Sequence, residues 1–104
     1  PINSLYKGTP LIKSRKYFEI LRTLKINKIL ITICDKQERF KAIELAREYN
    51  MELISAIHPS VLVLDDALIA DSVIIHAGVI IGYKAEIKSG VIVNSGSIIE
   101  HHCV

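Results

Sequence analysis

An aliphatic residue recurs at every sixth position through the second half of the chain, without a single gap. The eight members of this series are Ile57, Val63, Ile69, Ile75, Ile81, Ile87, Val93 and Ile99. A helix is excluded, because six steps of 100° send successive members to different helix faces. A period of six instead fits a solenoid with three flat sides, in which each six-residue unit supplies one side and one inward side chain. Three units make a coil of about 18 residues, so residues 57–104 fill roughly two and two-thirds coils.

A second series follows four positions after the first, and its members are small or β-branched: Val61, Ala67, Val73, Val79, Ala85, Val91, Ser97 and Cys103. We expect this series to be buried near the corners of each coil. The glycines at positions 78, 82, 90 and 96 are expected to mark corners that need unusual backbone angles.

The first half of the chain has a different pattern. Ser14 is the expected cap of a helix that ends near Lys25, and residues 28–33 are β-branched and apolar, which predicts a strand buried on both faces. Asp35 and Glu38 form a predicted capping box at the start of a second helix that runs to about residue 49. That helix is expected to bury Phe40, Ile43 and Ala46. Residues 51–55 form the next strand, so we expect a βαβ unit with a parallel strand pair.

Two short motifs resemble a known family. Residues 93–104 read Val-Asn-Ser-Gly-Ser-Ile-Ile-Glu-His-His-Cys-Val, and residues 58–60 read His-Pro-Ser. Together with the six-residue period they resemble the sialic acid O-acetyltransferase and bacillosamine-type sugar N-acetyltransferase family of hexapeptide-repeat acyltransferases.

The resemblance implies an α/β region followed by an all-β region. Residues 1–55 would form a partial Rossmann-like module that binds a nucleotide-sugar, and residues 56–104 an incomplete left-handed parallel β-helix. Family members have a further strand and a glycine-rich phosphate loop before the part that matches, and several coils after it. The chain is therefore expected to be truncated at both ends relative to that family.

The resemblance also implies a reaction of the kind used in polysaccharide biosynthesis. Acetyl-CoA would donate an acetyl group to an amino group or hydroxyl of a nucleotide-activated sugar or sialic acid, with His101 as the general base. A neutral imidazole suits this role at pH 7, and a positioned base is worth about 10²–10⁴-fold in rate. Glu100 and His102 would complete the catalytic group, and Asn94 and Ser95 would contact the substrate.

His102 departs from the family pattern, which has Asp or Glu directly after the histidine. An acid would orient His101 and stabilise its imidazolium form, whereas a second imidazole supplies no negative charge. We therefore expect reduced or absent activity. The alternative function is a non-catalytic β-helix that serves as a binding or assembly module and lacks the acetyl-CoA site.

No metal site is expected. His58, His76 and Asn94 follow one another at a spacing of one coil, so they should occupy equivalent places on successive coils. We expect them to form a polar surface ladder, because a metal site needs three or four convergent ligands. Cys34 and Cys103 show no paired spacing and are expected to be reduced.

Charge and hydropathy limit the kinds of binding partner that we expect. Residues 1–50 contain eleven Lys and Arg against five acids, which would suit an anionic nucleotide-sugar or a nucleic acid. Most of these basic residues fall on the outer faces of the predicted helices, so we expect solvated faces and no nucleic-acid partner. No apolar run is long enough for a membrane span, and we expect no membrane partner and a cytoplasmic protein. By resemblance we also expect a homotrimer.

Overall fold

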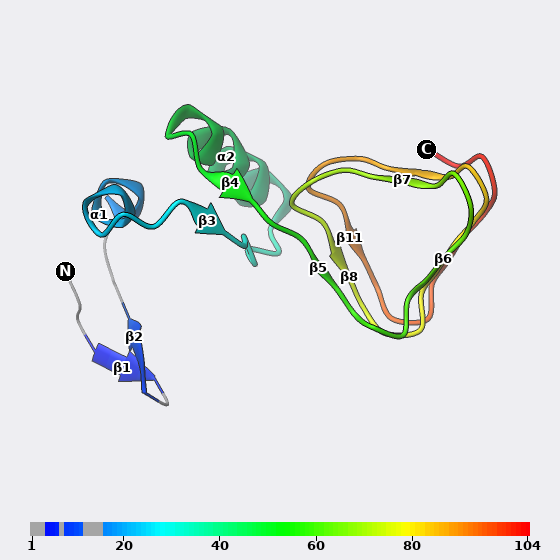
Figure 1. The fold of residues 1–104 in the computed structure, drawn as a ribbon, viewed down its shortest axis with the longest axis horizontal. Coiled ribbons are helices and arrows are strands. Elements are labelled where there is room, and N and C mark those ends of the chain that lie inside the picture. Colours follow the sequence, from blue (N-terminus) through cyan, green and yellow to red (C-terminus); the bar gives the residue numbers. More distant parts are fainter. Residues whose placement is uncertain (1–3, 7, 12–15) are drawn as a thin grey trace.

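The computed structural model describes residues 4–6, 8–11 and 16–104. Its main feature is a solenoid of short parallel strands, to which a βαβ unit is joined at one corner (Figure 1). The elements are β1 (Ser4–Tyr6), β2 (Thr9–Leu11), α1 (Tyr17–Thr23), β3 (Lys28–Ile29), α2 (Lys36–Glu48), β4 (Glu52–Leu53), β5 (Ala56–Ile57), β6 (Leu62–Val63), β7 (Leu68–Ile69), β8 (Ile74–Ile75), β9 (Ile80–Ile81), β10 (Glu86–Ile87), β11 (Ile92–Val93) and β12 (Ile98–Ile99).

Each strand of the solenoid pairs in parallel with the strand three elements further along the chain. The three stacks are β5–β8–β11, β6–β9–β12 and β7–β10, and Ile57 lies opposite Ile75, which lies opposite Val93. Paired residues are therefore separated by three units of the repeat, which confirms the predicted coil. Figure 1 looks down the solenoid, where the coils superimpose as a triangle.

The three corners of the triangle are named here by their residues. The first corner comprises residues 58–61, 76–79 and 94–97; the second, residues 64–67, 82–85 and 100–103; the third, residues 70–73 and 88–91. From position 66 to position 102, every sixth residue has a positive φ, whether or not it is glycine. These residues are Asp66, Ser72, Gly78, Lys84, Gly90, Gly96 and His102.

The core of the solenoid contains every member of the predicted aliphatic series except the first two, Ile57 and Val63. Ile75 and Ile81 are fully buried, and Val73, Val79 and Ala85 from the second series fill the space beside them. Ile57 and Val63 lie opposite Ile75 and Ile81, as the inward series predicts, but each is 43% exposed, so an inward position at the first coil does not bury the side chain. No described residue packs over that end. Cys103, expected to be buried, is exposed at the opposite end for the same reason.

In the βαβ unit, β3 and β4 pair in parallel around α2, which confirms the predicted strand, helix and strand. The Asp35 carboxylate accepts a hydrogen bond of 3.0 Å from the Glu38 amide, as expected for the cap. Glu38 does not complete a capping box, since its carboxylate instead lies 3.7 Å from Lys41 Nζ. Helix α1 is shorter than predicted, and the expected cap Ser14 lies outside the described residues.

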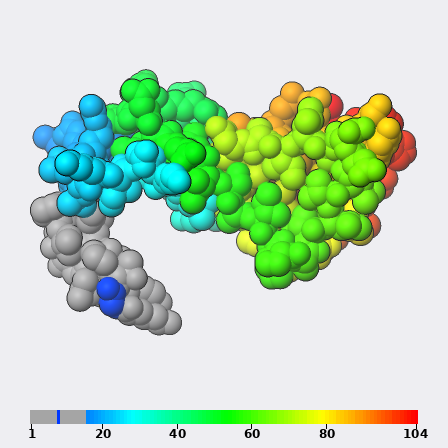
Figure 2. All heavy atoms as spheres, in the orientation of Figure 1, coloured from blue at the N-terminus to red at the C-terminus, as the bar shows by residue number. Residues whose placement is uncertain are grey.

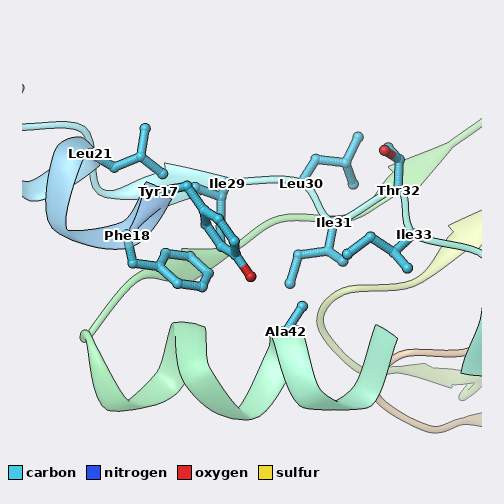
Figure 3. A pocket seen from close by; sticks show the side chains of 9 residues that line it. All are labelled: Tyr17, Phe18, Leu21, Ile29, Leu30, Ile31, Thr32, Ile33 and Ala42. Atoms are coloured by element: carbon cyan, nitrogen blue, oxygen red, sulfur yellow. The ribbon is translucent and has the colours of Figure 1, made fainter. Parts of the chain in front are cut away.

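Residues 28–33 were expected to be buried on both faces, and they are not. Figure 3 shows Ile31 pointing toward α2 while Leu30 and Thr32 point away from it. Ile31 is 7% exposed and Leu30 is 37% exposed. Only one face of this segment is covered: Ile31 belongs to the cluster that contains Ala42 and Ile43 of α2, whereas Leu30 and Thr32 are exposed.

A buried arginine joins the βαβ unit to the solenoid, and the sequence pattern did not predict it. Arg39 is 2% exposed, whereas Phe40, predicted to be buried, is 41% exposed. The guanidinium donates to the Gly90 carbonyl at 2.8 Å and the Ser72 carbonyl at 2.6 Å, and also to the Ile31 carbonyl. Burial lowers the pKa of Arg39, and the ring of carbonyl acceptors replaces the water that the charge has lost.

A second contact between the two units lies at the surface beside Arg39. Arg47 donates to both carboxylate oxygens of Asp71, at 2.9 and 3.1 Å, and Ser89 donates to Asp71 at 2.5 Å. The hydrogen bond from Arg47, followed by the one from Ser89, lowers the pKa of Asp71. The βαβ unit therefore packs against the third corner of the solenoid, and the two lie side by side in Figure 2.

Neither α1 nor α2 has the length or apolar character to cross a membrane, within the residues that the structure describes.

Candidate functional site

His101 lies at the second corner of the solenoid, beside an open groove. The groove has a volume of about 520 Å³ and is lined by Leu64, Ile80, Gly82, Tyr83, Ile98, Ile99, Glu100 and His101. Its walls are largely apolar, and the side chains of Tyr83, Glu100 and His101 supply the polar groups. Gly82 and Tyr83 occupy the matching positions on the coil below Glu100 and His101, so the repeat length alone brings these pairs together.

Gly82 allows the coil that carries His101 to approach closely. Its amide donates to the Ile99 carbonyl at 2.8 Å. A Cβ at this position would lie 2.6 Å from both the Ile99 carbonyl oxygen and the His101 amide nitrogen, and 2.7 Å from the Glu100 carbonyl carbon. All three atoms belong to the backbone, so no side-chain rotation would relieve the contact. Unlike the other corner glycines, Gly82 is required for space and not for its φ angle.

The side chain in contact with His101 is His102. The two Nδ1 atoms are 3.0 Å apart, and the ring planes are at 89° to each other. His102 also packs against Tyr83, with ring centroids 5.7 Å apart and planes at 90°. The sequence singled out His101 and His102 but gave no sign of Tyr83. Tyr83 could have been found only by counting back one coil from His101.

Glu100 lines the same groove but does not contact His101 through its carboxylate. No hydrogen bond or ion pair of that carboxylate is found in the described part of the chain, and Glu100 is exposed. The structure therefore places His101, His102 and Glu100 at one corner, with only the two histidines directly bonded.

Asn94 and Ser95 lie at the first corner, one side of the triangle away from His101. Asn94 is exposed, and its carbonyl accepts a bond of 3.2 Å from the Ser97 amide. Ser95 lines a different groove, of about 610 Å³, together with His58 and His76. The structure thus does not bring the predicted substrate-binding residues together with His101 within one chain.

His58, His76 and Asn94 form a vertical series at the first corner, as their spacing of one coil predicted. The His58 amide donates to the Ile75 carbonyl and the His76 amide to the Val93 carbonyl, both at 3.0 Å. His58 Nδ1 lies 2.8 Å from the Ser60 hydroxyl and accepts from the Ser60 amide at 3.0 Å. Among residues 16–104 and the described parts of the N-terminal hairpin, no group of three His, Cys, Asp or Glu could hold a metal ion.

The βαβ unit has a cavity of its own, of about 300 Å³, between α1, α2 and residues 29–33 (Figure 3). Its lining is apolar apart from the Tyr17 and Thr32 side chains, and contains no charged residue. The lining of this cavity therefore has no cationic side chain that could bind a phosphate group.

The fold of this chain matches three solved structures. The chain is similar to PerB from Caulobacter crescentus in complex with CoA and GDP-perosamine, with a TM-score of 0.84 and 29% identity over 90% of the chain. It is also similar to a His→Ala variant of the GDP-perosamine N-acetyltransferase (TM-score 0.86, 26% identity over 95%). A His→Asn variant of perosamine N-acetyltransferase matches with a TM-score of 0.84 and 27% identity over 93% of the chain. Both variants come from Caulobacter crescentus and contain CoA and GDP-perosamine.

The chain spans slightly less than half of each of these structures, 45–47% of their length. No protein-family model matches the chain. The structures that resemble it are thus sugar N-acetyltransferases that contain CoA and a nucleotide-sugar, and their folds match 90–95% of this chain.

Proposed function

We propose that this chain is the central part of an acetyltransferase that moves an acetyl group from acetyl-CoA to an amino group on a nucleotide-activated sugar. His101 would act as the general base. The observation that carries this proposal is the groove at the second corner, where His101 projects beside a largely apolar wall. The similar structures support the amino sugar over a hydroxyl or a sialic acid, since they contain GDP-perosamine and CoA. A left-handed coil and a cytoplasmic location, expected from the sequence, belong to the same proposal.

The residues present fit the donor in chemical character. An apolar wall formed by Leu64, Ile80 and Ile98 suits the extended arm of CoA, and the imidazole lies at the end of that wall. Acetyl-CoA would supply the acetyl group as an activated thioester. His101 Nε2 would accept a proton from the attacking amine as the new bond forms, and would then return it to the leaving thiolate. Glu100 lies close enough to the groove to influence the charge around the acceptor.

The acceptor would be held by residues 1–55, as a module for the nucleotide-sugar. This module packs on the third corner, whereas His101 lies on the second. A nucleotide-sugar held by one copy is thus separated from the His101 of that copy. We propose that the chain acts as a trimer, in which the module and the Asn94 corner of neighbouring copies approach each His101.

The face formed by β6, β9 and β12 is the proposed contact between copies. Its outward residues are Leu62, Ile80 and Ile98, and two of them are strongly exposed, Leu62 at 53% and Ile98 at 62%. Light scattering should give a trimeric mass, and Ile98→Lys should reduce it to that of a monomer. A monomeric parent chain would contradict the proposed assembly.

The activity is tested by mixing the protein with acetyl-CoA and GDP-perosamine and following the release of free thiol. His101→Ala should lower the rate at least about 100-fold, the lower range for loss of a general base. Leu68→Ala is the control, since Leu68 is 62% exposed on the β7–β10 face, outside the groove and outside the proposed contact between copies. Equal rates for His101→Ala and the parent would exclude His101 as the base. Binding of nucleotide-sugar or acetyl-CoA without turnover would favour the non-catalytic alternative.

A further inference from the structure

The residue that follows His101 is held firmly in place, although it lies at the surface. His102 has φ of 59°, and its amide donates to the Tyr83 carbonyl at 2.9 Å. Its ring packs edge to face on Tyr83, and Lys84 Nζ lies 5.3 Å from the centroid of the Tyr83 ring. Backbone and ring are thus both anchored to the coil below, so the position of His102 Nδ1 is set by the solenoid and not by solvent.

The contact between the two histidines restricts where their protons lie. Nδ1 atoms 3.0 Å apart are hydrogen-bonded only when one of them carries hydrogen and the other presents a lone pair. Two arrangements of the neutral pair satisfy this condition. If His101 Nδ1 carries the hydrogen, His101 Nε2 has a free lone pair. If His102 Nδ1 carries it, His101 Nε2 must carry hydrogen and has no lone pair to accept a proton.

We propose that His102 is a positioning residue that accepts the hydrogen bond from His101 Nδ1–H and so leaves His101 Nε2 as the base; this inference rests on the proposed function. When Nε2 of His101 takes the proton of the amine, the imidazolium still donates its Nδ1–H to the Nδ1 lone pair of His102. The bond then becomes charge-assisted and stronger. A neutral imidazole therefore orients and stabilises His101 in the place where the sequence led us to expect a carboxylate.

The corner geometry offers two matched substitutions. Position 102 belongs to the series of positive-φ corner residues in which Gly78, Gly90 and Gly96 also occur, so His102→Gly removes the imidazole without backbone strain. Asn also tolerates this φ region, and its Oδ1 lies near the place of a histidine Nδ1. His102→Asn therefore restores an acceptor for His101 Nδ1–H.

The proton arrangement is tested by NMR of the protein labelled with [15N]histidine. We expect a scalar coupling between the Nδ1 atoms of His101 and His102, hydrogen on Nδ1 of His101, and a non-protonated Nε2 on the same ring. The spectra of the His101→Ala and His102→Gly variants assign these signals. Absence of the coupling, or hydrogen on Nε2 of neutral His101, would overturn the inference.

Kinetics supply the second readout. His102→Gly should lower the rate constant for acetyl transfer by about 10–100-fold, the range found for outer groups that orient histidine ligands. The Michaelis constants should stay within twofold, and His102→Asn should recover most of the rate. A rate for His102→Gly equal to that of the parent would refute the positioning role. Failure of the proposed function gives a different result: the parent protein shows no turnover, or His101→Ala reacts as fast as the parent, while the parent still shows the coupling between the two Nδ1 atoms.

Discussion

Replacing Gly82 by alanine tests how the solenoid places His101. The added Cβ would lie 2.6 Å from the His101 amide and the Ile99 carbonyl, whereas ordinary contact begins at 3.4 Å. The coil above must therefore move by about 0.8 Å, the difference between these distances. Overpacking of this kind costs about 1–3 kcal/mol of stability, and a displacement near 1 Å at a reacting group costs about 100-fold in rate.

Two measurements check this expectation. Guanidinium unfolding should show a loss of about 1–3 kcal/mol in Gly82→Ala, and thiol release from acetyl-CoA should slow by roughly 100-fold. Gly8→Ala is the control, because a Cβ at Gly8 meets nothing within 4 Å and the residue lies in the β1–β2 turn. Gly8 has a φ of +85°, so alanine there should cost about 1–2 kcal/mol through backbone strain alone, with no clash between coils. If Gly82→Ala unfolded and reacted like the parent, the close approach of the coils would not position His101.

Three further predictions concern the contact between the βαβ unit and the solenoid, and the solenoid core. Arg39→Met removes the guanidinium that donates to the Gly90 and Ser72 carbonyls, so urea unfolding should show a loss of about 3 kcal/mol or more in the free energy of unfolding. A loss below about 1 kcal/mol would contradict this role. The pKa of Asp71 is lower in the folded protein than in the unfolded chain, where it is near 3.9. Asp71 therefore stabilises the protein at pH values above about 3.9, and this stabilisation is lost as the pH falls through the pKa of the folded state. Asp71→Asn should therefore be less stable than the parent by about 0.2–1 kcal/mol at pH 7, and this difference in stability should disappear below about pH 4. A difference in melting temperature that stays the same at all pH values would argue against the pair with Arg47. Ile81→Ala should cost about 2–5 kcal/mol, because Ile81 is fully buried, and Leu68→Ala much less, because Leu68 is 62% exposed. Equal losses in thermal unfolding would show that the inward series does not form the core.

The repeat was readable from the sequence because it depends only on local order along the chain. Aliphatic residues six apart specify which side chains share an inward line, and three such units close one coil, so the pairing of Ile57 with Ile75 follows by counting. The capping role of Asp35 was predictable for the same reason, since its acceptor and donor lie three residues apart. The second corner could also have been assembled by counting one coil back from Glu100 and His101 to Gly82 and Tyr83.

Tertiary structure alone decided how deeply each residue lies and which polar atoms meet. Ile57 fits the inward series as well as Ile75 does, but its burial depends on whether a neighbouring coil covers it. Most basic residues of the helices were expected on solvated outer faces, yet carbonyls from residues 31, 72 and 90 converge on Arg39. The contact between His101 and His102 depends on a backbone angle set at the corner and on the Tyr83 ring from another coil. Periodicity specifies the coil, but the direction of a side chain at a corner is set by groups that lie a full coil or more away along the chain.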